Sequence, residues 1–271
     1  MKHVFEAYFI QCITNMHVGS GDANYGVVDK LVQRDTVTGF PTIHPSSLKG
    51  ALREHFEQQP NWNKGSDNIN KIFGKEAIGG TDSETGEYKF LGADMVSLPV
   101  RCNFEQYVLA VNKKQIEELN QKSKLLTTKE IFKLPADASN KFFYQPGQPG
   151  YDLYAEDIKI ENSHKVAHSP LLQATSNLSG FDTKYATFDN ESFKAITANL
   201  PVIARNCIED GTSDNLWYEE VVPHQSVFLT FIATTSTLKT EFEQILSDGI
   251  VQIGGNATIG YGLCKFYKIT L

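Results

Sequence analysis

The chain has 271 residues, of which 41% are hydrophobic and 11% aromatic, so length and composition suit a folded domain rather than a disordered segment. Its formal net charge of -7 has the wrong sign for a free-standing nucleic-acid binder, because such affinity depends largely on neutralising phosphates. The charge alone favours a small-molecule enzyme. A nucleic-acid site would need locally clustered basic residues, or repetition of the site through assembly of many copies.

Neither hydropathy nor cysteine spacing indicates a membrane or secreted protein. No stretch approaches the roughly 20 apolar residues of a membrane helix, and the N-terminus lacks the apolar core of a signal peptide. The four cysteines lie far apart without a CxxC pair, which argues against a structural zinc site and a disulfide framework. We therefore expect a cytoplasmic protein.

The apolar pattern predicts strands and helices along the whole chain. Strands are expected at 4–14, 30–34, 88–101 (a pair around Gly92), 202–208, 216–222, 226–234 and 262–271. Helices are expected from Ser46 or Ser47 to about Pro60, and at 113–121, 192–200 and 240–247. The sequence EDGTSD between two of these strands predicts a hairpin with a loop longer than two residues.

The outer elements read strand, helix, strand, strand, helix, strand, which is the order of an α+β ferredoxin-like fold. Polar, glycine-containing stretches separate them, and we place long insertions at 61–86 and 122–200. Trp62, in the first insertion, is expected to be exposed, whereas Trp217 is expected to anchor the base of the hairpin. His164 and His168, four residues apart, are interpreted as surface loop residues rather than metal ligands.

Three segments carry a family resemblance. They are MHVGSGDANYGVVDKLVQRDTVTGFPTIHPSSLKGALREHF at 16–56, KIFGKEAIGG…GEYKFLGADMVSLPVR at 71–101, and QIGGNATIGYGLCKF at 252–266. In this order they resemble the repeat-associated (RAMP) proteins of CRISPR systems, and most closely the target-RNA-cleaving backbone subunits of type III-B effector complexes. Residues 205–223 are similar to the thumb hairpin of those subunits and the strand that follows it.

The resemblance implies a single RAMP domain over 1–271 with an RNA-recognition-motif-like ferredoxin core and a projecting β-hairpin thumb at 205–217. It implies that copies of the chain stack into a helical filament along a CRISPR guide RNA, together with other effector subunits and without a membrane. The thumb would enter between guide RNA and complementary target RNA. We assign Arg205, Ile208 and Leu216 to this RNA contact, with the apolar pair as the wedge.

The segment SSLKGALR offers a second candidate RNA contact. Ser46 or Ser47 is expected to cap a helix whose free N-terminal amides suit an anion. Lys49 and Arg53, four residues apart, share one helical face. This arrangement favours contact with the RNA backbone rather than with base edges. The alternative is an ordinary capped helix with a solvated basic edge.

Gly254, Gly255, Gly260 and Gly262 form the third candidate RNA contact. The segment lacks the Lys-Ser/Thr of a phosphate-binding P-loop and leads into a strand, so it is no nucleotide fingerprint. Its glycines would let backbone amides approach a phosphate closely. Alone, the pattern equally describes a tight hairpin that needs positive φ angles, and the family resemblance favours RNA contact.

The loop from His17 to Asp35 contains the candidate reaction site, with carboxylates at Asp22, Asp29 and Asp35. RNA cleavage by the neighbouring 2′-hydroxyl needs a base or metal to take the proton and a charge to steady the leaving oxygen. By resemblance, Asp29 is the cleavage aspartate and the ligand of a divalent metal, Mg²⁺, and His17 and Glu219 are further catalytic residues. From sequence alone, an Asp in a loop is usually a turn residue.

The sequence thus predicts a metal-dependent endoribonuclease that binds guide RNA as a filament and cuts target RNA at regular intervals, in antiviral defence. Three alternatives stay open. One is a filament subunit that binds guide RNA without cleaving, and another is the backbone subunit of a type III-A complex. The third is an acidic small-molecule enzyme on a ferredoxin-like fold, for which no cofactor motif is found.

Overall fold

The structure is a computed structural model that describes residues 3–21, 26–75, 83–132, 141–143, 152–162, 185–235 and 237–270. Asp22, His164 and His168 lie outside them, as do large parts of the predicted insertions at 61–86 and 122–200. No helix in the described ranges is long and apolar enough to cross a bilayer.

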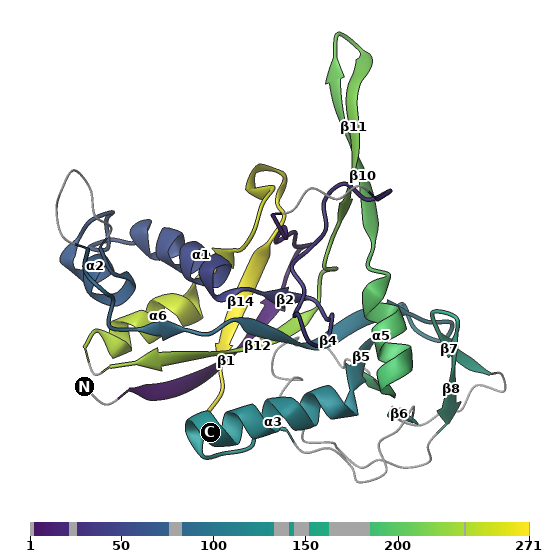
Figure 1. Ribbon diagram of the computed structural model, residues 1–271, viewed down its shortest axis with the longest axis horizontal. Coiled ribbons are helices and arrows are strands. Elements are labelled where there is room, and N and C mark those ends of the chain that lie inside the picture. The colour runs from purple at the N-terminus through teal and green to yellow at the C-terminus, as the bar shows by residue number, and fades with distance from the viewer. Residues whose placement is uncertain are drawn as a thin grey trace.

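A large, mostly antiparallel sheet forms the centre of the molecule (Figure 1). Its middle strands lie side by side in the order β14 (Leu263–Lys268), β1 (Val4–Cys12), β12 (Val227–Thr234) and β4 (Ala93–Arg101). Each neighbouring pair in this group is antiparallel. Every residue of β12 is buried, as expected for a central strand that is covered on both faces.

Alternation along the central strands divides the core into two clusters. Tyr8 and Ile10 of β1 face a cluster that includes α1 (Pro45–Glu57) and α6 (Lys239–Asp248). Ala7 and Phe9 face a second cluster, which is completed by α3 (Lys113–Thr127). The sheet is therefore packed between helices on both faces.

The sheet continues beyond this group through shorter strands. These are β2 (Thr42–Ile43), β3 (Lys89–Phe90), β5 (Tyr107–Asn112), β6 (Lys141–Phe143), β7 (Leu153–Ala155), β8 (Ile158–Asn162), β9 (Tyr185–Phe188) and β13 (Ile250–Gln252). The strands β5 and β9 are parallel, as are β6 and β8. The strand predicted at 30–34 is not continuous, since residues 30, 32 and 34 form isolated bridges to three different partners.

The remaining helices are α2 (Asp67–Phe73), α5 (Asn190–Ala198) and the short 3-10 helix η1 (Ala257–Ile259). The helices predicted at 113–121, 192–200 and 240–247 are confirmed as α3, α5 and α6. The predicted N-cap of α1 is wrong, because the cap is His44 and Pro45 occupies the first turn. The fixed φ of proline suits that position, so the helix begins before Ser46 and Ser47.

The expectation for Trp62 is also wrong. Its side chain is 3% exposed, and its ring packs edge-to-face on Phe56, with centroids 5.1 Å apart. The same segment contains α2, whose Ile69, Ile72 and Phe73 are buried. These few apolar residues give an otherwise polar stretch one face that docks on α1.

The hairpin is confirmed as a separate two-stranded sheet of β10 (Val202–Glu209) and β11 (Thr212–Glu220). It stands well away from the body of the molecule (Figure 1). Its connection is shorter than predicted, because Asp210 and Gly211 alone form the turn, with φ of 47° and 79°. Two successive positive φ angles match the twist of a tight hairpin and favour Asp-Gly.

Candidate functional site

The segment around Asp29 lies against the root of the hairpin. The amides of Asp29 and Lys30 both donate to the Tyr218 carbonyl at 3.1 Å, and the Glu220 amide donates to the Lys30 carbonyl at 2.9 Å. The Tyr218 amide in turn donates to Oδ2 of Asp29 at 2.8 Å. Asp29 is thereby fixed to β11 through both its backbone and its side chain.

The Asp29 side chain is exposed, and only one of its carboxylate oxygens has a hydrogen-bond partner among the described residues. The other oxygen is available to a further ligand. Nowhere in the described ranges are three or more His, Cys, Asp or Glu side chains grouped to hold a metal ion. A single exposed carboxylate still fits Mg²⁺, which proteins commonly hold through one or two carboxylates completed by substrate phosphates and water.

Glu219 occupies the centre of the hairpin root. Its side chain is 1% exposed, and Oε1 accepts hydrogen bonds from Lys30 Nζ and Trp217 Nε1, both at 3.0 Å. Oε2 accepts from Asn256 Nδ2 at 2.9 Å and from Arg205 Nη1 at 3.3 Å. One carboxylate therefore joins both hairpin strands, the Asp29 segment and the segment near the C-terminus.

Hydrogen bonds and nearby charges keep the pKa of this carboxylate low in spite of its burial. Burial alone would raise the pKa of Glu219. The hydrogen bonds from Trp217 and Lys30, with the nearby charges of Lys30 and His17, lower that pKa below its ordinary value of 4.5. With both oxygens occupied, Glu219 is built to hold its neighbours in place.

Cations and aromatic rings alternate around this carboxylate. Lys30 Nζ lies 5.1 Å from the centroid of the Trp217 ring, and Arg205 Cζ lies 5.8 Å from the centroids of both Trp217 and Tyr261. Such spacings are typical of cation–π contacts. The predicted anchoring role of Trp217 agrees with these contacts. The prediction that Arg205 binds RNA remains untested, and its guanidinium is already engaged inside the chain.

The adjacent Glu220 secures the opposite face of the root, because successive side chains of a strand point to opposite faces. Its carboxylate accepts from the Val32 amide at 3.0 Å and pairs with Arg34. Arg34 also donates to the Thr197 carbonyl at 2.8 Å. The two glutamates thus attach residues 29–34 to β11 from both faces.

His17 reaches the same strand. Its ring is buried, and Nδ1 lies 2.7 Å from the carbonyl oxygen of Glu220. Because a carbonyl oxygen only accepts, Nδ1 carries the proton of this bond. The structure therefore brings together His17, Asp29 and Glu219, the three residues selected from the sequence. Asp29 and His17 bond to Tyr218 and Glu220, which lie on either side of Glu219 in β11.

The glycine segment at 254–262 packs beside His17. The Gly255 amide donates to the His17 carbonyl, and the amides of Gly260 and Gly262 donate to the Ala257 and Asn15 carbonyls. A Cβ on Gly254 would lie 2.3 Å from the His17 carbonyl oxygen, so only glycine allows this approach. Three of the four amides are used within the chain, as in the tight-turn alternative, and the RNA contact predicted for them is untested.

Of the four residues predicted to bind RNA on α1, two are exposed and two are hydrogen-bonded within the chain. Ser46 and Lys49 are exposed, whereas Ser47 Oγ accepts a hydrogen bond from Gln33 at 2.9 Å. Arg53 donates to Glu57 at 2.9 Å and to the Gly74 carbonyl at 3.2 Å, which links α1 to the end of α2. Lys49 is therefore the accessible cation of this pair.

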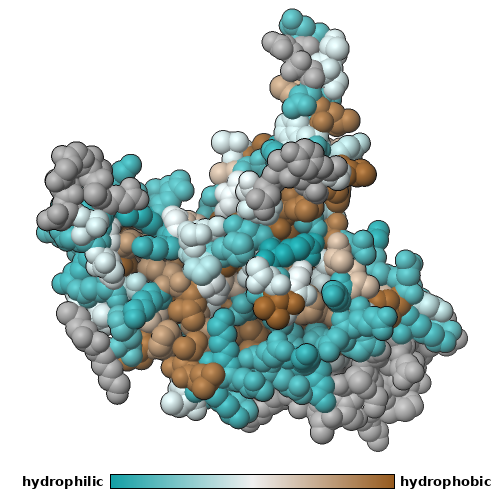
Figure 2. Space-filling model, in the orientation of Figure 1, coloured by the Kyte–Doolittle hydropathy of each residue, from teal (hydrophilic) through white to brown (hydrophobic). Residues whose placement is uncertain are grey.

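Apolar side chains are exposed along the hairpin, as the brown patches on its lower part show (Figure 2). Leu216 is 53% exposed and Tyr218 is 38% exposed, and they lie two residues apart on one face of β11. Ile208 lies in β10, but its side chain is outside the described set. The predicted wedge therefore has one accessible apolar member, Leu216, and one neighbour that was not predicted.

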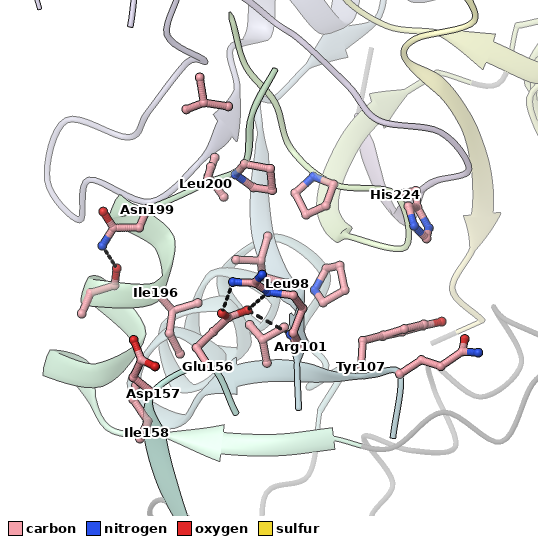
Figure 3. A pocket seen from close by; sticks show the side chains of 17 residues that line it. Leu98, Arg101, Tyr107, Glu156, Asp157, Ile158, Ile196, Asn199, Leu200 and His224 are labelled. Carbon is pink, nitrogen blue, oxygen red and sulfur yellow. Dashed lines mark hydrogen bonds and ion pairs between the residues drawn. The ribbon is translucent and has the colours of Figure 1, made fainter. Parts of the chain in front are cut away.

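A cavity of about 820 Å³ lies beside the hairpin root, between β4, β5, β8 and α5 (Figure 3). Arg101 and Glu156 form an ion pair in it at 2.7 Å, and much of its remaining wall is apolar. None of the predicted site residues lines this cavity. It is separate from the cluster around Glu219.

Several members of the cluster were not found by sequence reasoning, namely Lys30, Arg34, Glu220, Asn256 and Tyr261. Lys30 and Glu219 are 189 positions apart, and Asn256 is 37 positions beyond Glu219. No local spacing joins them. The available signals were the position of Lys30 directly after Asp29, and the presence of Asn256 and Tyr261 within the glycine segment.

Glu219→Gln tests whether the buried carboxylate holds the root together. We expect the free energy of unfolding at pH 7 to fall by about 2–4 kcal/mol, because charged hydrogen bonds between four donors and one acceptor group are weakened. A group with a lowered folded-state pKa stabilises the fold above its unfolded-state pKa, and loses that contribution as pH falls through the folded-state value. The difference between wild type and variant should therefore shrink as pH falls below 4.5.

Urea unfolding followed by circular dichroism across this pH range measures the difference. The exposed Glu54 provides the matched control, and Glu54→Gln should change stability by less than about 0.5 kcal/mol. An equal stability of wild type and Glu219→Gln at pH 7 would show that the four hydrogen bonds do not stabilise the fold.

Comparison with known proteins gives one family. Residues 9–265 match the RAMP superfamily. The chain is 26% identical over 280 residues to the "CRISPR system Cmr endoribonuclease Cmr4" of Pyrococcus furiosus, covering 96% of this chain and 92% of that protein. It also resembles the solved structures of a type III-B Cmr-beta complex in the apo state (TM-score 0.77, 21% identity, 98% of each chain) and of oligomeric Cmr4 from Pyrococcus furiosus (TM-score 0.74, 20% identity, 100% of each chain). The chain belongs to the RAMP superfamily.

Proposed function

We propose that this chain is a backbone subunit of a type III-B CRISPR effector, which binds guide RNA together with further copies of itself and cleaves complementary target RNA. One observation carries the proposal. Asp29, the expected cleavage aspartate, is hydrogen-bonded to the root of a projecting hairpin. The near full-length similarity to a protein named a Cmr endoribonuclease supports it, as does the fold shared with chains of Cmr-beta complexes, one of them bound to target RNA.

The core is ferredoxin-like in this proposal. Four strands in the order β14, β1, β12 and β4, all antiparallel to their neighbours, support it. In sequence, α1 lies between β1 and β4, and α6 lies between β12 and β14. This is the strand, helix, strand, strand, helix, strand order, in which the remaining strands and helices are additions.

The hairpin β10–β11 acts as the thumb that enters between guide and target bases. Its separation from the main sheet and its polar two-residue turn leave it free to project. The exposed Leu216 and Tyr218 provide apolar surface against which displaced bases pack, and an aromatic face is a good partner for a base. Lys49 on α1 supplies a backbone phosphate contact from an exposed position.

Cleavage proceeds by attack of the ribose 2′-oxygen on the adjacent phosphorus. The 2′-hydroxyl proton is removed as the new O–P bond forms. The P–O5′ bond then breaks and O5′ takes up a proton, which leaves a 2′,3′-cyclic phosphate and a 5′-hydroxyl. Displacement from the helical stack is what allows the 2′-oxygen to line up with the leaving oxygen. That need explains the placement of Asp29 at the thumb root.

Asp29 is the catalytic residue of this proposal, and His17 and Glu219 are positioning residues. Glu219 directly follows Tyr218, the residue that binds Asp29, and His17 bonds to the carbonyl of the next residue, Glu220. With RNA present, the carboxylate of Asp29 would hold Mg²⁺ together with phosphate oxygens, and the ion would supply charge that steadies the leaving oxygen.

Two replacements of Asp29 distinguish a catalytic role of its charge from a structural role of its hydrogen bond to Tyr218. Asp29→Asn keeps an oxygen that accepts from the Tyr218 amide but removes the charge, whereas Asp29→Ala removes both. We expect each to reduce target cleavage by the assembled complex by at least about 100-fold. Assembly and target binding should be retained, most fully in Asp29→Asn. The measurement is the single-turnover cleavage rate with Mg²⁺, beside filter binding of the target.

Cleavage by Asp29→Asn at the wild-type rate would rule out a catalytic role for the carboxylate. If neither variant assembled, Asp29 would be a structural turn residue instead.

Shortening the hairpin tests the thumb. A short Gly-Ser turn in place of residues 207–215 removes the outer part of a two-stranded sheet that is separate from the main sheet. We therefore expect the circular dichroism spectrum and melting temperature of the body to be retained. The assembled complex should lose its cuts or their regular spacing on gel analysis of end-labelled target. Regular cuts by this variant would contradict the thumb assignment.

A further inference from the structure

We propose that Lys30 is a further catalytic residue, whose ammonium contacts the scissile phosphate and stabilises the negative charge that develops on its nonbridging oxygens. This inference rests on the proposed function, since it concerns the same reaction. Lys30 directly follows Asp29, and both amides donate to the Tyr218 carbonyl. The two side chains therefore leave the backbone at the same part of the hairpin root.

The cations that pair with Glu219 carry more positive charge than this one carboxylate neutralises. Two cations, Lys30 and Arg205, meet one carboxylate, so one positive charge is not neutralised by it. Glu219 already accepts from three other donors, on Trp217, Arg205 and Asn256. Lys30 contributes one of the four hydrogen bonds to this carboxylate. The excess positive charge is suited to an anion that arrives from outside.

Exposure identifies which of the two cations meets that anion. The Lys30 side chain is 54% exposed, whereas that of Arg205 is 22% exposed and lies between the rings of Trp217 and Tyr261. An ammonium has three N–H donors, and one is directed to Glu219. Two donors remain for phosphate oxygens. Lys30 is thus both accessible and able to bond an anion without leaving Glu219.

The same contacts hold the ammonium in position before RNA arrives. Its nitrogen lies 3.0 Å from Glu219 Oε1 and 5.1 Å from the Trp217 ring centroid. A flexible lysine stem is thereby restricted to one region beside Asp29. Lys30 pairs with Glu219, whereas the Asp29 carboxylate accepts from the Tyr218 amide through one oxygen. The second Asp29 oxygen is therefore available to the substrate or a metal ion. A fixed cation stabilises a developing anion more than a mobile one, because it needs no reorganisation during the reaction.

Lys30→Gln tests the assignment, with Lys30→Arg as the variant that restores the charge. We expect Lys30→Gln to lower the single-turnover cleavage rate of the assembled complex at saturating target by about 100-fold. Its Kd for target should change by less than about 3-fold, because one phosphate contact in a long duplex is lost. Lys30→Arg should recover most of the rate. Lys30→Gln also removes one donor to the buried Glu219 carboxylate, so the rates are compared at a temperature at which circular dichroism shows every variant folded.

The matched control is Lys114→Gln, which removes another exposed lysine, from α3, that also faces a glutamate. It should cleave at the wild-type rate. Wild-type cleavage by Lys30→Gln overturns the inference while leaving the proposed function intact. So does a variant that loses target affinity but keeps its rate at saturation. Failure of the wild-type complex to cut complementary RNA overturns the proposed function, and this inference with it.

Discussion

The geometry of the hairpin root depends on the hydrogen bonds to one buried carboxylate, that of Glu219. An isolated ionised carboxylate is costly to bury, and the cost is offset only when hydrogen bonds and opposite charges satisfy it. Here four donors from separate parts of the chain do so. Removing any of these segments would leave a buried charge partly unpaired. The hairpin, the Asp29 segment and the 254–262 segment are thereby held in one relative position, although far apart in sequence.

This arrangement answers the difficulty raised by the net charge of -7. A phosphate-binding site does not require a basic protein if positive charge is concentrated where the phosphate must lie. At the hairpin root, two cations share one carboxylate, and Lys49 is exposed on α1. Assembly of copies along an RNA would repeat each of these sites, so acidic surfaces elsewhere need not prevent binding. The same repetition places one candidate reaction site beside each hairpin.

Much of the fold was predictable because periodicity and local signals are strong in the central elements. The buried β12, the amphipathic α6 and the hairpin strands follow from alternation and spacing. The expectations were wrong at three places: Pro45 starts α1 before the two serines, Asp210 and Gly211 form a tight turn, and Trp62 joins the core. Each correction comes from one or two residues whose effect depends on tertiary packing or on an exact backbone angle.

The candidate site was predictable only in part, for a different physical reason. His17, Asp29 and Glu219 could be selected by resemblance. In the structure, Asp29 and His17 bond to the two residues that flank Glu219 in β11. Which of the three is catalytic and which position their neighbours could not be predicted from the sequence. Glu219 and Lys30 meet across 189 positions, and the use of the glycine amides within the chain depends on how the loop packs on His17. Contacts of this kind are set by the fold and leave no local pattern.

The central claim is that the hairpin root, with Asp29 and Lys30, is where the target phosphate lies. A structure of the assembled complex on target RNA tests it directly, with a 2′-deoxynucleotide at the cut site to remove the attacking oxygen. We expect the phosphate at that position to lie within hydrogen-bond distance, about 3.2 Å or less, of Lys30 Nζ, and to lie beside the Asp29 carboxylate. A phosphate held elsewhere, with the hairpin root facing solvent or protein, would contradict the account.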